Sequence, residues 1–145
     1  MLNDSRIDIY DYLYNLLYDV VTKNVYSMRE PQELTKSDTE DGFIVIHVGD
    51  LNDEGEFNGQ AYGWARCYIE AFVPPITRGR LDYEKYKTFE DGINTVIKLA
   101  TEDNTGTYFI QEGSVLSMDA DETSNANNSY FTFIKSFIVN IDKQE

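Results

Sequence analysis

Hydrophobic residues recur at steps of three and four positions in two segments of the chain. This spacing places the side chains along one face of an α-helix. It predicts a helix over residues 5–23 and a second over residues 82–101, whose first turn Asp82 can cap. The apolar positions are Ile9, Leu13, Leu16, Leu17, Val20 and Val21 in the first, and Tyr86, Phe89, Ile93, Val96, Ile97 and Ala100 in the second.

Other segments have the shorter period or the β-branched content of strands. Residues 43–48 form an apolar run rich in Val and Ile, which predicts a buried strand. Residues 61–73 alternate between small side chains on one face and large amphipathic ones on the other, until Pro74 and Pro75 end the strand. The small face lets a helix lie close to the sheet, and the large face suits a second layer or a partner.

The remaining pattern predicts two more strands and several polar connections. Strands are expected over residues 107–118, with a bulge near Gly113, and over residues 129–142, which are apolar on both faces. Residues 29–41, 50–60 and 119–128 are polar and predict connections without strands. The order predicts one α+β domain over residues 1–145, a mainly antiparallel sheet of about four to five strands with two helices packed on one face. Because those helices cover only one face, another copy of the chain is expected on the other.

The charge of the chain limits its partners. Twelve Lys and Arg stand against 26 Asp and Glu, a formal net charge of −14. Such a surface repels nucleic acid and anionic membranes, and no apolar run of about 18 residues or secretory signal is visible. Two interpretations remain open: the acidic loops keep an aromatic-rich domain in solution, or they line a passage through which DNA slides without adhering.

Few residues suggest chemistry. The single cysteine, Cys67, excludes an intramolecular disulfide and a multi-cysteine zinc site, and the single histidine, His47, excludes a two-histidine metal site. We expect Cys67 to be a buried inert thiol and His47 to be structural, since its apolar strand offers no nucleophile motif. Phosphate-loop, dinucleotide and zinc-hydrolase motifs are absent from the sequence. The sequence therefore predicts no enzyme, no metal and no cofactor.

Residues 50–60 resemble a calcium loop only in part. Gly55 occupies the sixth position, but Ala61 stands at the twelfth, where a bidentate acid is required. A solvated hairpin loop is the better interpretation. The acidic residues of this loop are Asp50, Asp53, Glu54 and Glu56.

Four of the twelve cations, Arg78, Arg80, Lys85 and Lys87, lie within ten residues of one another. On an acidic chain this cluster predicts a dipolar surface, in which the basic patch of one subunit meets an acidic patch, such as residues 50–56, on the next. Alternatively, Arg78 and Arg80 only solubilise a loop. The residues expected at subunit contacts are Tyr62, Trp64, Tyr68, Phe72, Arg78 and Arg80.

The order of elements over residues 7–21, 43–48, 61–72, 83–100 and 108–141 resembles the tail-terminator or tail-completion proteins of tailed bacteriophages. The resemblance implies a non-enzymatic subunit of the virion, assembled in the host cytoplasm. It implies a ring of about six or twelve copies in the neck or tail, in contact with other neck, portal or tail proteins. DNA would pass through the ring without specific binding.

Two other function classes remain open. One is an acidic monomeric or dimeric adaptor or inhibitor that binds a basic host protein, with its acidic loops imitating phosphates. The other is a small α+β enzyme, which requires a pocket that gathers His47 with carboxylates.

Overall fold

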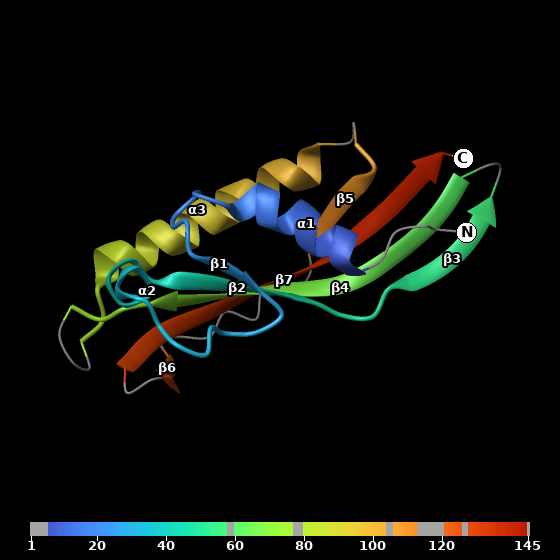
Figure 1. Ribbon diagram of the computed structural model, residues 1–145. Helices are drawn as coiled ribbons and strands as arrows, with labels where there is room; N and C mark the ends of the chain where they lie inside the picture. The colour runs from blue at the N-terminus through green and yellow to red at the C-terminus, as the bar shows by residue number, and fades with distance from the viewer. Residues whose placement is uncertain are drawn as a thin grey trace.

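A computed structural model describes residues 6–57, 60–76, 80–103, 106–112, 121–125 and 128–144 (Figure 1). The elements, in chain order, are α1 (Arg6–Leu17), β1 (Val25–Ser27), α2 (Lys36–Asp41), β2 (Phe43–Val48), β3 (Asn52–Phe57), β4 (Gln60–Val73), α3 (Tyr83–Glu102), β5 (Tyr108–Glu112), β6 (Asp121–Asn125) and β7 (Asn128–Gln144).

The two longest strands, β4 and β7, form the centre of the sheet. They pair antiparallel without a register shift from Gln60 opposite Gln144 to Val73 opposite Phe131. The main path of the sheet is β1-β2-β4-β7-β5, while β3 also pairs with β4 and β6 with β7. Only the β1–β2 pair is parallel among these described strands. The predicted α+β class with a mainly antiparallel sheet is therefore confirmed.

The two long helices, α1 and α3, lie over the same face of the sheet (Figure 1). The small residues of β4 face them, and Ala65, Cys67, Ile69 and Ala71 are all buried in the main core. The short alanine and cysteine side chains among them let the helices lie close to the strands, as expected. From the helices, this core receives Ile9, Tyr10, Leu13, Leu17, Phe89, Ile93, Ile97 and Ala100.

Helix α1 ends at Leu17, six residues before the predicted end. Asp19 has a φ of 60°, in the left-handed region that a continuing helix does not use. The turn that follows packs against α3 at Gly92, where an added Cβ would lie 2.5 Å from the Cγ1 atom of Val21. A glycine inside α3 therefore allows this close contact, which outweighs its weak helix propensity.

The predicted polar connection over residues 29–41 contains α2, and β1 lies just before it. A capping box begins α2: the Thr35 side chain accepts from the Asp38 amide at 3.1 Å, and Asp38 accepts from the Thr35 amide at 2.9 Å. The Asp38 carboxylate is fully buried and also accepts from the Tyr26 hydroxyl at 2.7 Å. This bond joins α2 to β1. Burial, followed by the hydrogen bond to Asp38 and its charge, raises the pKa of Tyr26 to about 12.

A second, smaller core lies on the face of the sheet away from α1 and α3. It consists of Phe43, Val45, Phe72 and Tyr130, with Tyr26 and Leu34 packed against it. Phe72 was expected at a subunit contact, but it is fully buried here and stacks on Phe43 with ring centroids 4.5 Å apart. Phe72 therefore does not lie on an exposed contact surface as predicted, because the side chains of Tyr26 and Leu34 pack over this end of the face.

Two predicted loops contain strands. Residues 52–57 of the acidic loop form β3, which pairs with the first residues of β4 and has a register shift between Asp53 and Gly55. Residues 121–125 of the loop over 119–128 form β6. The strand predicted over 107–118 is β5, Tyr108–Glu112, and the bulge expected near Gly113 lies outside the described residues.

The Asp38 contacts make this side chain important for stability. We expect Asp38→Ala to lower the free energy of unfolding by about 2 kcal/mol, because the helix cap and the hydrogen bond to Tyr26 are lost together. Glu40→Ala, on an exposed position of the same helix, should change it by less than about 0.5 kcal/mol. Urea denaturation of both variants measures the difference, and equal effects would contradict the assigned role.

Candidate functional site

The face of the sheet opposite α1 and α3 is only partly covered. Beyond the second core, side chains of β2, β4 and β7 keep exposed surface, and we call this area the open face. Its members alternate with core residues along each strand, and the strand register places them side by side. They are His47, Trp64, Arg66, Tyr68, Glu70, Ile134, Ser136, Ile138 and Asn140.

Aromatic and charged groups contact one another on the open face. The His47 ring stacks on Tyr68 with centroids 4.3 Å apart and an interplanar angle of 13°. Its Nε2 atom lies 3.6 Å from Oε1 of Glu70, an ion pair only when the imidazole is protonated. The Arg66 guanidinium lies 5.7 Å from the ring centroid of Trp64. Burial, followed by the charge of Glu70, raises the pKa of Tyr68.

The enzyme hypothesis requires His47 beside carboxylates, and the structure does bring it to Glu70. The hydroxyl of Ser136 also lies on this face, because Ser136 is opposite Tyr68 on β7 and Tyr68 is opposite His47 on β2. Ser136 is thus two strands from His47, roughly 10 Å between backbones at the usual strand spacing. That separation, with the Tyr68 strand between them, is too large for a nucleophile and base in direct hydrogen bond.

Cys67 lies on the opposite side of β4, in the main core. Burial raises its thiol pKa to about 12, a shift only partly offset by a hydrogen bond with the backbone of Val139. A thiol that stays protonated is neither a nucleophile nor a metal ligand. The description of Cys67 as a buried thiol is confirmed.

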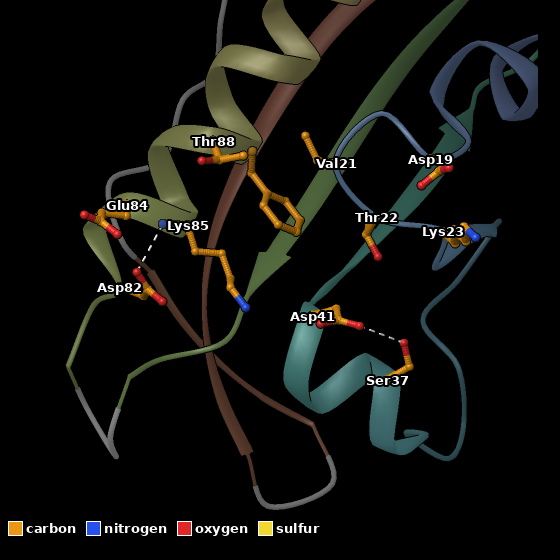
Figure 2. A pocket seen from close by; sticks show the side chains of 11 residues that line it. Asp19, Val21, Thr22, Lys23, Ser37, Asp41, Asp82, Glu84, Lys85 and Thr88 are labelled. Carbon is orange, nitrogen blue, oxygen red and sulfur yellow. Dashed lines mark hydrogen bonds between the residues drawn. The ribbon is translucent and has the colours of Figure 1, made fainter.

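A hollow of about 610 Å³ lies at the end of the molecule where α2 ends and α3 begins (Figure 2). Four carboxylates line it, against the ammonium groups of Lys23 and Lys85. Lys85 bridges the two helices by donating from Nζ to the carbonyl of Glu40 at 2.7 Å. We call this the acidic hollow, and its carboxylates belong to Asp19, Asp41, Asp82 and Glu84.

The residues predicted for subunit contacts are separated by the fold. Trp64 and Tyr68 lie on the open face, with Tyr68 40% exposed. Tyr62 belongs to β4, but its side chain lies outside the described part of the structure, as does the whole of Arg78. Arg80 is exposed on the connection that leads into α3.

The predicted acidic partner segment lies far from Arg80. Asp50 is exposed between β2 and β3, and Asp53, Glu54 and Glu56 belong to β3. Because β3 pairs with the beginning of β4 while Arg80 follows its end, the two segments lie toward opposite ends of that strand. The sequence analysis identified neither the His47–Glu70 pair nor the acidic hollow. The pair depends on the strand register, and the hollow depends on the position of α2.

Within the described residues, no group of three or more His, Cys, Asp or Glu side chains could hold a metal ion. No helix in the described ranges is long and apolar enough to cross a membrane. Comparison with protein-family models and with curated proteins found no match to this chain.

The burial of Cys67 predicts its reactivity. We expect the native protein to react with a disulfide reagent such as Ellman's reagent at least about a hundredfold more slowly than the urea-unfolded chain, because the native thiol is both protonated and enclosed. Absorbance of the released thiolate at constant pH measures both rates. Comparable rates in the two states would contradict the burial.

Proposed function

We propose that this chain is a non-enzymatic structural subunit of a phage virion, which assembles with copies of itself into a ring in the neck or tail through which DNA passes. The observation that supports it best is the open face. The long central strands of the sheet have α1 and α3 on one side, while the part of the other side that the α2 segment does not cover presents Trp64, Tyr68, Ile134 and Ile138 at its surface.

The physical argument concerns the apolar surface left in the single chain. Large hydrophobic and aromatic residues gathered on one exposed area are typical of protein contacts. Tyr and Trp are favoured in such contacts because they bury much area and still bind through polar atoms. Arg66 over Trp64 and His47 on Tyr68 give the face the mixed aromatic and charged character of protein interfaces.

The assignment to phage rests on the resemblance in element order, which includes the two long helices and the strands β2, β4, β5 and β7. The observed fold adds β1, α2, β3 and β6 to that pattern. The charge of −14 is consistent with a channel wall that DNA does not adhere to.

Native mass spectrometry with negative-stain electron microscopy of the same sample tests the proposal. A closed ring with a central hole is the expected result. A strict monomer or a closed dimer at all protein concentrations would overturn self-assembly into a ring, and would favour the adaptor that binds a basic host protein.

The open face also yields a mutational prediction. Trp64→Glu should reduce the fraction of assembled protein at least about tenfold, since it puts an unpaired charge into the contact. Leu99→Glu is the matched control, because Leu99 is 61% exposed on α3 and belongs to neither face of the sheet. Analytical ultracentrifugation measures assembly, and circular dichroism checks that both variants fold. Equal assembly of the two variants would exclude the open face from the contact.

A further inference from the structure

A second hollow, of about 660 Å³, begins on the open face and ends beside the first turn of α1. Two guanidinium groups line it, those of Arg6 and Arg66. Arg6 comes from α1 and donates to the carbonyl of Val48 at 2.5 Å, whereas Arg66 comes from β4. We call this hollow the arginine groove, and its other lining residues include Tyr10, Met28, His47 and Tyr68.

Across the part of the chain that the structure describes, no carboxylate lies within ion-pair distance of Arg6 or Arg66. No Asp or Glu is among the residues that line the groove; Glu70 lies beside it, 3.6 Å from Nε2 of His47, and Asp11 lines the adjoining hollow. The groove is therefore a local positive area on a negative molecule, available to an acidic group from outside.

Exposed apolar side chains surround the arginine groove. Met28 is 51% exposed and Tyr68 40% exposed, and both line the groove itself. Ile7 and Tyr14 line an adjoining hollow of about 330 Å³ that shares Tyr10 and Met28 with the groove. Apolar surface next to two arginines suits a protein partner better than a small free anion.

The acidic hollow has the complementary composition. Its four carboxylates outnumber its two ammonium groups, and Tyr83, beside Glu84 in the first turn of α3, is 77% exposed. Ile76, on the connection that leads into α3, is 62% exposed. Like the groove, the hollow thus combines charge with exposed apolar surface, but its charge has the opposite sign.

The groove and the hollow lie at opposite ends of β2. Asp41 of the hollow comes just before the first residue of β2, and Val48, which binds Arg6, is its last. A six-residue strand spans about 20 Å. Figure 1 likewise shows α2 and the beginning of α3 at one end of the molecule, away from the beginning of α1.

We infer that the arginine groove of one copy of this chain binds the acidic hollow of the next copy. Because the two surfaces differ and lie at opposite ends, the contact is head-to-tail and is repeated from copy to copy, and such a contact forms a ring when the rotation between copies closes. The inference rests on the proposed self-assembly and names its contact surfaces: Arg6 and Arg66 face Asp41 and Glu84 of the neighbour.

Charge reversal on each side, followed by mixing, tests this contact. One variant combines Arg6→Glu with Arg66→Glu, and the other combines Asp41→Lys with Glu84→Lys. Alone, each variant opposes like charges at every contact and should assemble at least about tenfold more weakly than the wild type. Mixed in equal amounts, the two should regain assembly in alternating order, because every groove then meets a hollow of opposite charge.

Matched controls make the same changes of charge elsewhere on α3. Lys98→Glu, compared with the single substitution Arg66→Glu, and Asp91→Lys with Glu102→Lys alter exposed positions and should assemble like the wild type. Native mass spectrometry reads the order of subunits in the mixture. Circular dichroism reports folding, and single substitutions at Arg66 and Glu84 replace any double variant that does not fold.

The outcomes separate the inference from the proposed function. If the charge-reversed variants still form rings like the wild type, the groove–hollow contact is wrong and the proposed ring remains. The same conclusion follows if the wild type forms rings but the mixture of the two variants does not regain assembly. A closed dimer that responds to both reversals and to mixing would support the contact and overturn the ring. A wild-type chain that stays monomeric at every salt concentration would overturn both.

Discussion

The antiparallel pairing of β4 with β7 is the constraint on which the rest of the structure depends. Fourteen consecutive pairs join Gln60–Val73 to the last strand, and every other strand except β1 attaches directly to one of these two. A shift of one residue in this register would move Cys67 and Ile69 to the open face and bring Arg66, Tyr68 and Glu70 under the helices. The cost of burying those polar groups fixes the register, and with it the separation of an apolar core from an aromatic, charged surface.

The same pairing explains why the two faces have different coverage. On one side, the small residues of β4 let α1 and α3 pack closely, and the core there extends along the sheet. On the other side, Phe72 and Phe43 need cover that helices do not supply, and the β1–α2 segment provides it through Leu34 and Tyr26. Its position is fixed by the buried carboxylate of Asp38, which caps α2 and binds the Tyr26 hydroxyl. The cover reaches only one end, so the open face is what remains.

The sequence predictions are correct where the pattern is long and periodic. The range of α3, its cap at Asp82 and the two faces of β4 all follow from spacing alone, and the structure confirms them.

The sequence predictions fail where tertiary contacts override local preference. Val20 and Val21 continue the helical spacing, but a left-handed residue at Asp19 turns the chain so that Val21 meets Gly92. Residues 52–57 are polar with a glycine, which suggests a loop, and they form β3 because the beginning of β4 offers an edge for pairing. The Thr35–Asp38 spacing was a visible capping signal, but burial of Asp38 depends on Tyr26 from another element.

The candidate surfaces also include features that the sequence predicts and features that only the structure shows. The large residues of β4 were visible as one face in the sequence, whereas the His47–Glu70 contact and the arginine groove required the strand register and the position of α1.

The distribution of charge determines how two copies of the chain can associate. Each copy carries a formal charge of −14, so two copies repel one another at long range. Salt screens that repulsion beyond roughly 8 Å at physiological ionic strength, but screens charges in direct contact much less. A contact between the arginines of the groove and carboxylates of a neighbouring copy therefore remains attractive under conditions in which the overall repulsion is largely removed. An acidic chain that places two arginines in one groove can in this way favour a single orientation of its neighbour, while acidic surface elsewhere disfavours other orientations.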